Sequence, residues 1–326
     1  MISQFTPGQE ITLFFVLRNK NYRIKSENQR EYLSLELGDA SGRIFGTIWD
    51  NVKASDSQLR IGTVVKVQGM IIDWHGKSHI SIKKIRPAIP SDQVSLEQFL
   101  PCSQTPIDQL FEEFCSQAKT IQDTHLKYVM DTVLNDEALV ARLKKAPGGK
   151  LWHHNYLGGV LEHTLNVAAL VSAIGRYYPN INHDILLCGA LTHDIGKVNE
   201  YDWRGYIDFS DHGRMLGHIV MGFHLIANII DKKADFPDEL GKQLLHLILS
   251  HHGRKEYGSP VEPMTREAII LNFADEIDSK MGAFERIYNT EHQDGRKWSS
   301  YIKLLDRFLY FGENKKEPIL PVKTKT

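Results

Sequence analysis

Several common features are scarce or missing in this 326-residue sequence, and each excludes a class of protein. There are only three cysteines, Cys102, Cys115 and Cys188, and their odd number and wide spacing exclude a disulfide framework and a zinc ribbon. No apolar run approaches the roughly 20 residues of a membrane span, and the first ten residues lack the basic stretch and apolar core of a secretory signal. There is no internal repeat or low-complexity segment. We therefore expect a cytoplasmic protein that does not span a membrane.

The composition is that of an ordinary globular protein, with 42% hydrophobic and 24% charged residues, and the length suffices for two domains. The net charge of −1 conceals an asymmetry, because residues 1–87 carry 13 Lys and Arg against 8 Asp and Glu. This excess of positive charge favours a polyanionic partner.

The first 87 residues have the pattern of a small β-barrel. Five short segments between residues 11 and 86 alternate apolar and polar side chains, and the turn sequences DASG and WHGK interrupt them. Five strands in so short a stretch predict an OB-fold, a Greek-key barrel that commonly binds oligonucleotides. Residues 88–104 follow as a proline-rich linker.

From residue 105 to 311 the periodicity is helical, which predicts an all-α second domain. Thr105 and Pro106 form a cap and first turn that open it. The expected helices in the part that bears the motifs are 157–177, 183–196, 215–231, 238–252, 265–288 and, from a weaker pattern, 297–311. Residues 312–326 lack helical periodicity and are expected to form a loose tail.

Histidines are concentrated in the helical domain, with 11 of the 15 between His153 and His252. His193 and His251 each end an apolar stripe with helical spacing, so their imidazoles are expected to point into the core. Buried histidines need partners, and several that converge with carboxylates most simply share a metal ion. The mixed nitrogen and oxygen donors of the His193-Asp194 pair suit Mn²⁺, Fe²⁺, Co²⁺ or Zn²⁺ better than Mg²⁺ or Ca²⁺.

The order of these motifs resembles the HD superfamily of metal-dependent phosphohydrolases. The resemblance implies that four residues are the signature metal ligands: His163, His193, Asp194 and Asp275. His218 and His251 match the longer pattern of members that hold two ions. Members that hold three ions carry a glutamate four residues before the first histidine, where this chain has Gly159, so a third ion is not expected.

Taken together, the segments GGVLEHT, HDIGK, SHHG and YGSP, after an OB-like barrel, resemble the YhaM family of bacterial 3'-5' exoribonucleases over residues 10–290. The resemblance implies hydrolysis of single-stranded RNA from the 3' end to nucleoside monophosphates, with Mn²⁺ as the expected metal and Co²⁺, Fe²⁺ or Zn²⁺ as alternatives.

Other residues are assigned roles around this centre. Asp194 and Lys197 are the expected catalytic residues, because an ammonium near the motif would reach a metal-bound phosphate. The expected substrate contacts in the helical domain are His153, His154, His252, Arg254 and Ser259.

In the barrel, strand parity places Tyr32, Phe45 and Trp49 on the outer surface, where bases can stack. Four basic side chains of the first hairpin are expected to follow phosphates: Arg18, Lys20, Arg23 and Lys25. The alternative for the three aromatic residues is packing against the helical domain.

Two other functions compatible with the sequence are hydrolysis of a small nucleotide, with the barrel docking a protein, and binding of single-stranded nucleic acid by a chain whose HD site is only structural. The sequence leaves open the native metal, activity on single-stranded DNA, and the oligomeric state, including a homo-oligomer.

Overall fold

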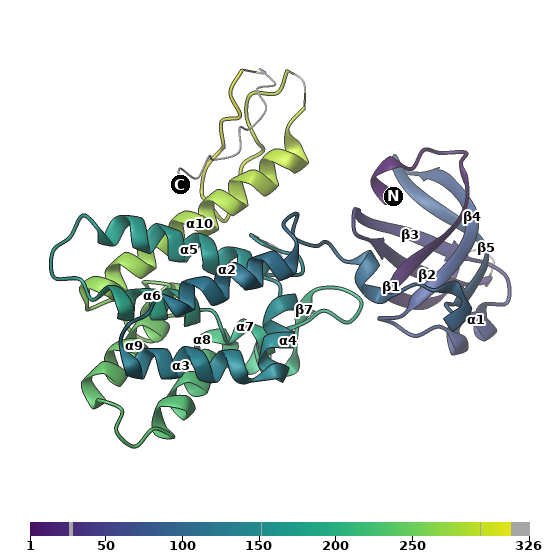
Figure 1. Ribbon diagram of the computed structural model, residues 1–326. Coiled ribbons are helices and arrows are strands. Elements are labelled where there is room, and N and C mark those ends of the chain that lie inside the picture. Colours follow the sequence, from purple (N-terminus) through teal and green to yellow (C-terminus); the bar gives the residue numbers. More distant parts are fainter. Residues whose placement is uncertain (26–28, 151, 294, 314–326) are drawn as a thin grey trace.

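The computed structural model describes residues 1–25, 29–150, 152–293 and 295–313. Figure 1 shows two units, a β-barrel and a larger helical domain, joined by an extended linker. The predicted tail 312–326 lies almost wholly outside the described residues.

The N-terminal unit is the predicted five-stranded closed barrel, with strand order β1-β2-β3-β5-β4. Its elements are η1 (Ile2–Gln4), β1 (Glu10–Ile24), β2 (Glu31–Asp39), β3 (Gly42–Ile48), α1 (Val52–Gln58), β4 (Val64–Trp74) and β5 (Lys77–Pro87). Leu33 and Leu37 of β2 pair with Ile48 and Ile44 of β3, and all four side chains are buried. The predicted strand parity is therefore correct, and the aliphatic side chains fill the barrel. The short helix α1 was not anticipated.

The linker contains two 3-10 turns, η2 (Pro90–Asp92) and η3 (Leu96–Phe99). Arg86 holds Asp92 through two hydrogen bonds of 2.7 and 2.8 Å, which anchors the start of the linker to the end of β5. This bidentate pair lowers the pKa of Asp92 well below its usual range.

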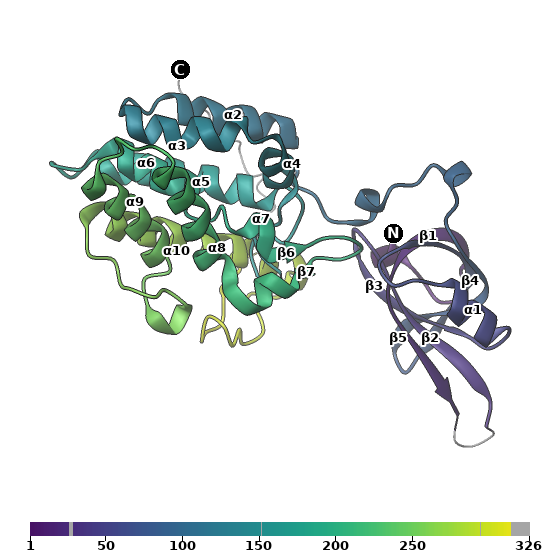
Figure 2. The same ribbon diagram turned by 90° about the horizontal axis from the view of Figure 1, so that it is seen from below.

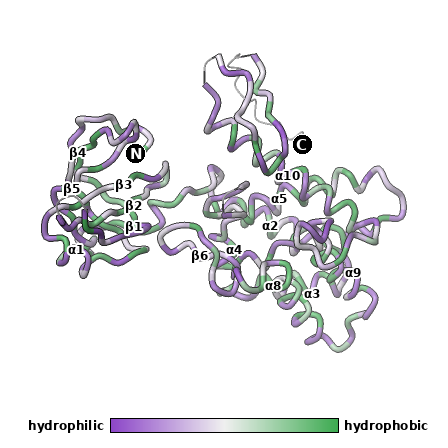
Figure 3. Tube along the Cα trace, turned by 180° about the vertical axis from the view of Figure 1, so that it is seen from behind, coloured by the Kyte–Doolittle hydropathy of each residue, from purple (hydrophilic) through white to green (hydrophobic). Residues whose placement is uncertain are grey.

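The second unit is helical, as predicted. Its elements are α2 (Ile107–Lys119), α3 (Thr124–Asn135), α4 (Glu137–Lys145), α5 (Gly159–Gly175), α6 (His183–Thr192), α7 (Lys197–Glu200), the two-stranded β6 (Tyr201–Asp202) and β7 (Asp208–Phe209), α8 (Asp211–Asp231), α9 (Asp238–Ser250), η4 (Lys255–Tyr257) and α10 (Arg266–Glu291). Buried side chains from the helices α2 through α6, and from α8, α9 and α10, form one apolar core. In Figure 3 the hydrophobic stretches alternate with hydrophilic ones along these helices, as expected of helices that each bury one face.

Two predicted helices differ from the structure. The helix expected at 183–196 ends at Thr192, so the His193-Asp194 pair lies in the turn between α6 and α7. The helix expected at 297–311 is absent, and residues there form isolated bridges, Trp298 with Tyr310 and Ile302 with Arg307. Serine side chains explain this, because Ser299 accepts a hydrogen bond from the Leu309 backbone and so offers an alternative to helical bonding.

Helix α8 is, among the described residues, the one helix long and apolar enough to cross a membrane by length and composition alone, a property that core helices of globular proteins share. Gly217 has non-helical dihedral angles and interrupts this helix. Helix α8 packs against α7, α9 and α3.

The barrel and the helical domain meet at two glycines. The loop between β6 and β7 extends toward the barrel in Figures 1 and 2, and a Cβ on Gly205 would lie 2.6 Å from the Cα of Gly62. Both glycines have positive φ, so neither position accommodates a larger side chain without strain.

Candidate active site

Five helical elements bring the predicted metal ligands to one buried point. His163 comes from α5, His193 and Asp194 from the turn after α6, His218 from α8, His251 from the end of α9, and Asp275 from α10. All are buried except His218, whose side chain is 12% exposed. The set that the sequence predicted is therefore one cluster, although it spans more than 110 residues.

Asp194 lies at the centre of this cluster, between two pairs of histidines. Its Oδ2 is 3.3 Å from His163 Nε2 and 3.5 Å from His193 Nε2. Its Oδ1 is 3.5 Å from His218 Nε2 and 3.6 Å from His251 Nε2. Each carboxylate oxygen therefore faces its own pair of imidazole nitrogens, as a ligand that bridges two ions would.

Asp275 lies close to only one of these two pairs of histidines, His163 and His193. Its Oδ1 is 3.1 Å from His163 Nε2 and 4.0 Å from His193 Nε2. His163, His193 and Asp275 form one group with the geometry to hold a metal ion, and His218, His251 and His252 form another. His252 was predicted to contact substrate, and this arrangement makes it an additional candidate ligand.

Three of the four histidines are fixed by hydrogen bonds from their other ring nitrogen to backbone carbonyls or to Glu200. His193 Nδ1 donates to the Ala190 carbonyl and His251 Nδ1 to the Ile248 carbonyl, each at 2.7 Å. His218 Nδ1 donates to Glu200 Oε1 at 2.9 Å. Because carbonyl and carboxylate oxygens only accept, Nδ1 carries the proton, and the Nε2 lone pairs point to the centre.

Several polar atoms at the centre lack the partner that burial requires. Among the described residues, Asp194 Oδ1, His218 Nε2 and His251 Nε2 are buried without a hydrogen-bond partner. Such a collection of buried acceptors is costly by itself and is satisfied by divalent cations, so the residues fit the predicted metal centre.

The charges at the centre also favour cations. Burial opposes ionisation of Asp194, but Lys197 and His193 hold the pKa of its carboxyl well below the usual range. Burial likewise opposes the charge on His163, yet the carboxylates of Asp194, Asp275 and Asp278 raise the pKa of its imidazole well above the usual value. The carboxylates around His163 and Asp194 therefore stay ionised, and their negative charge attracts cations to the centre of the cluster.

Lys197 lies at the start of α7 and is 5% exposed. Its Nζ is 2.6 Å from Asp194 Oδ2, and the pKa of its ammonium is raised by this carboxylate against the effect of burial. The Lys197 ammonium, which was predicted to reach a phosphate, thus forms an ion pair with Asp194 and stabilises the ionised form of that carboxylate.

Sequence reasoning missed the carboxylates that orient two of the ligands. Asp278 accepts a hydrogen bond from His163 Nδ1 at 2.6 Å, and Asn166 donates to its other oxygen at 2.8 Å. Glu200 performs the same task for His218. A signal existed, because Asp278 and Glu200 each follow a motif residue by three positions and so lie on the same helical face.

His154, which was predicted to contact substrate, belongs to this supporting network. Its Nε2 donates to Asp278 at 2.8 Å, and its Nδ1 accepts from the Tyr156 hydroxyl at 2.8 Å. Both ring nitrogens are thus engaged.

A Cβ at Gly159 would lie 2.7 Å from the backbone nitrogen of Gly148, so a glutamate does not fit where three-metal enzymes carry one.

We expect Asp278→Asn to lower the metal affinity of the protein by about 10- to 100-fold, because the amide holds His163 less firmly in the required tautomer. The measurement is the metal concentration that gives half-maximal hydrolysis, with the exposed Glu285→Gln on α10 as the matched control. A maximal rate recovered at high metal identifies Asp278 as a positioning residue, whereas an unchanged half-saturation point contradicts the role.

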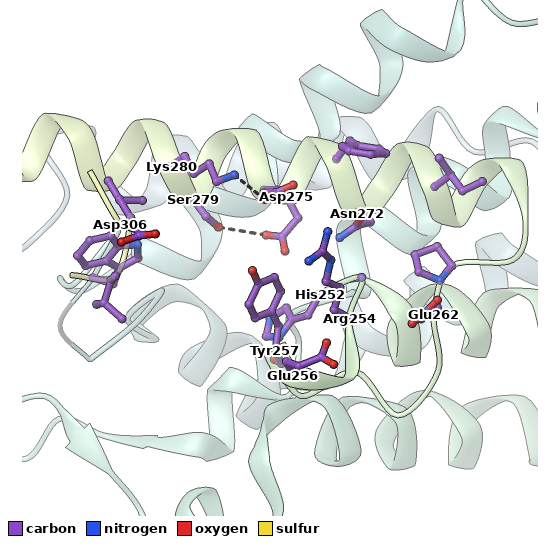
Figure 4. Close-up of a pocket in the computed structure, with 18 of the residues that line it drawn as sticks. His252, Arg254, Glu256, Tyr257, Glu262, Asn272, Asp275, Ser279, Lys280 and Asp306 are labelled. Atoms are coloured by element: carbon purple, nitrogen blue, oxygen red, sulfur yellow. Dashed lines mark hydrogen bonds and ion pairs between the residues drawn. The ribbon is translucent and has the colours of Figure 1, made fainter. Parts of the chain in front are cut away.

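A pocket of about 1190 Å³ opens beside the metal-binding cluster. In Figure 4, Asp275 and Ser279 on α10 lie across from Tyr257 and His252, with Arg254 nearby. The pocket thus contains two of the predicted substrate contacts, His252 and Arg254. Burial lowers the pKa of His252 to about 4, so its imidazole is neutral near pH 7.

The remaining two predicted contacts lie deeper. His153 is close to Ser279, whose hydroxyl is 3.4 Å from its Nε2, and burial lowers the pKa of its imidazole to about 3. Ser259 is 2% exposed and does not line the pocket, and its hydroxyl has no hydrogen-bond partner among the described residues, so its contact with substrate stays a prediction. The turn that follows η4 buries its side chain.

The three barrel aromatics lie on the outer surface, as parity predicted. Tyr32 and Trp49 pack against each other with ring centroids 5.0 Å apart, and Phe45 is 55% exposed. The sequence analysis missed that this aromatic surface continues onto β5 and β4, where His79 neighbours Phe45 and lies 5.7 Å from Trp74.

The four basic residues of the first hairpin do not act as one group. Lys20 forms an ion pair with Asp56 at 2.8 Å, and Arg18 lines a different pocket together with Arg43. Arg23 and Lys25 are exposed at the far end of β1.

A buried centre of histidines and aspartates in a helical domain, built on an HD pair, defines a metal-dependent phosphohydrolase of the HD type. The family model described as "HD domain" matches residues 160–280. The chain is 30% identical to the 3'-5' exoribonuclease YhaM of Bacillus velezensis over 86% of this chain and 88% of that protein. It is 29% identical to the protein of the same name from Bacillus pumilus, over 95% of this chain and 97% of that one.

Among solved structures, a domain of replication protein A from Methanococcus maripaludis is similar to 26% of this chain and 90% of its own, with 25% identity and a TM-score of 0.23. The chain belongs to the YhaM family of 3'-5' exoribonucleases.

Proposed function

We propose that this protein removes nucleotides one at a time from the 3' end of single-stranded RNA and releases nucleoside monophosphates. The observation that carries the proposal is the position of Asp194 between two pairs of histidines, beside a pocket large enough for a nucleotide. The similarity to the Bacillus exoribonucleases over most of the chain supports the RNA substrate and the direction of hydrolysis.

Two divalent ions, with Mn²⁺ the leading candidate, would be held by His163, His193 and Asp275 on one side of Asp194, and by His218 and His251 on the other. Bound there, they would lower the pKa of a water molecule and neutralise phosphate oxygens. The nitrogen and oxygen atoms that would ligate the ions are already buried and in position. The side chains of the site therefore need little reorganisation when substrate binds.

The pocket residues orient the substrate. Arg254 and Lys280 carry positive charge at the pocket wall, and the Tyr257 ring is 61% exposed and available to stack on a base. Hydrolysis breaks the bond between phosphorus and the 3' oxygen of the penultimate nucleotide, and the terminal nucleoside leaves with its 5' phosphate.

The barrel would hold the rest of the strand. Its outer aromatic surface suits stacking without sequence preference, and single-stranded DNA is a further candidate ligand because stacking does not require the 2' hydroxyl. The three free cysteines fit a reducing compartment, which supports location in the cytoplasm.

Incubation of 5'-labelled single-stranded RNA with the protein and Mn²⁺ tests the proposal. We expect a ladder of labelled fragments that shortens from the 3' end. Intact RNA with Mn²⁺, Co²⁺, Fe²⁺ and Zn²⁺ alike would overturn it. A panel of free nucleotides run in parallel distinguishes a small-nucleotide hydrolase, which would consume a member of the panel and leave RNA intact.

We also expect two metal ions per chain at saturation, because His218 and His251 add nitrogen donors that a single centre does not need. Elemental analysis after equilibration with Mn²⁺ provides the count. In the double variant His218→Gln/His251→Gln, the count should fall to one. A single ion per chain in the wild-type protein would contradict the two-metal site.

A further inference from the structure

A second pocket, of about 560 Å³, lies between the barrel and the helical domain. Four cationic side chains from separate parts of the chain line it: Arg18 of β1, Arg43 of β3, Lys150 from the segment before α5, and Arg286 of α10. None of the last three was singled out by sequence analysis, because their convergence depends on how the two domains meet.

Arg18 is held in an unusual environment. Gly38 on the neighbouring strand leaves room for its guanidinium, because a Cβ at that position would overlap Arg18 Nε. This nitrogen is buried and has no hydrogen-bond partner among the described residues. Burial and the charge of Arg43 lower the pKa of Arg18, against the opposing effect of the Glu36 and Asp39 carboxylates. The two guanidinium groups line the same pocket and repel each other, and a bound anion would relieve that repulsion.

The carboxylates near the pocket do not neutralise it. Asp39 accepts hydrogen bonds from the backbone nitrogens of Ile2, Ser41 and Gly42, which disperse its charge. Asp208 is shared between Lys150 at 2.5 Å and Arg214 at 2.8 Å. Glu36 pairs with Arg43 at 3.2 Å. The four cationic side chains that line the pocket therefore outnumber its three carboxylates.

One short segment of the chain contributes residues to both the interdomain pocket and the active-site pocket. Lys150 and Asn155 line the interdomain pocket, while Trp152, in the same segment, lines the active-site pocket. Arg286 donates a hydrogen bond to the Trp152 carbonyl at 3.4 Å. Arg286 also follows Asp275 on α10 by 11 residues, or about 16 Å along the helix axis. A strand of a few nucleotides would span that distance.

We propose that the interdomain pocket binds backbone phosphates of the RNA strand a few nucleotides upstream of the cleaved bond, and so guides the strand from the barrel to the metal centre. The inference rests on the proposed exoribonuclease function and adds to it a binding site shared by both domains. Guanidinium groups suit this ligand because they contact phosphate oxygens through two parallel hydrogen bonds.

The test compares the double variant Arg43→Ala/Arg286→Ala with wild-type protein in the full chain. A chelator prevents hydrolysis, and the dissociation constant of a labelled 20-nucleotide RNA is measured between 50 and 200 mM salt. Each phosphate contact to a single strand contributes about 0.7 to the slope of log affinity against log salt, so we expect the slope to fall by about 1.4. Across this salt range, wild-type affinity should then drop about sevenfold more than that of the variant.

The matched control is Arg60→Ala/Arg266→Ala, which removes two exposed arginines, one from each domain, outside the pocket. It should keep the wild-type slope. With Mn²⁺ present, kcat/KM for the 20-nucleotide RNA should fall in the pocket variant, while hydrolysis of a dinucleotide, too short to reach the pocket, should not change.

The outcomes separate the two proposals. If wild-type protein shortens RNA and the pocket variant retains both the wild-type salt slope and its kcat/KM on long RNA, the interdomain site is wrong and the exoribonuclease function stands. If wild-type protein leaves all RNA intact, the proposed function itself fails.

Discussion

Asp194→Asn should lower the rate of RNA hydrolysis by about 10³-fold or more. The carboxylate faces two imidazole nitrogens with each oxygen, and an amide offers one oxygen and one nitrogen that cannot bind a cation. Loss of several kcal/mol of charge stabilisation by bound metal corresponds to at least three orders of magnitude in rate. The measurement is single-turnover hydrolysis of 5'-labelled RNA in chelator-treated samples restored with Mn²⁺.

The fold should survive this substitution, because the amide oxygen can still accept a hydrogen bond from Lys197. Thermal unfolding checks this point, and Asp231→Asn, an exposed aspartate at the end of α8, is the matched control. A folded Asp194→Asn protein that turns over within about twofold of wild type would remove this residue from the catalytic centre.

Replacement of Tyr32, Phe45 and Trp49 by alanine should weaken binding of long single-stranded RNA by about 1–3 kcal/mol for each stacked base that is lost. Tyr32 of β2 and Phe45 of β3 lie on the outside of the barrel with Trp49, which directly follows β3, and aliphatic residues and Phe15 fill the barrel core without them. Filter binding or fluorescence anisotropy with 20-nucleotide RNA measures the change.

Hydrolysis of a dinucleotide should be unaffected in the same triple variant, since every metal ligand comes from the helical domain. Tyr177→Ala, which removes a tyrosine that is 85% exposed at the end of α5, controls for the loss of an exposed ring. Equal impairment of dinucleotide and long-RNA hydrolysis in a folded protein would show that the aromatics act structurally.

The relation between sequence and structure differs between the two domains. In the barrel, alternation alone placed Leu33 and Ile48 inside and Phe45 outside, because a strand has a period of two and the closed barrel has one interior. In the helical domain, periodicity pointed His193 and His251 inward, but it extended the first of these helices past Thr192, through the turn that carries His193 and Asp194.

The amino-acid sequence by itself determined the division into a barrel and a helical domain, the identity of the six metal-binding candidates and their membership in one site. The division into domains depends on residue type and on spacing within single elements, which local periodicity preserves, whereas the full ligand set follows from the resemblance of the ordered motifs to the HD superfamily. The fixed order of the motifs made their convergence predictable.

Only the tertiary structure decided which partners fix the ligands and where the two domains meet. Asp278 orients His163 across 115 residues of sequence, and His154 contributes to the same network. Arg286 and Arg43 share a pocket although they belong to different domains. Such contacts depend on how separate elements pack, and neither the period of a helix nor the parity of a strand encodes that packing.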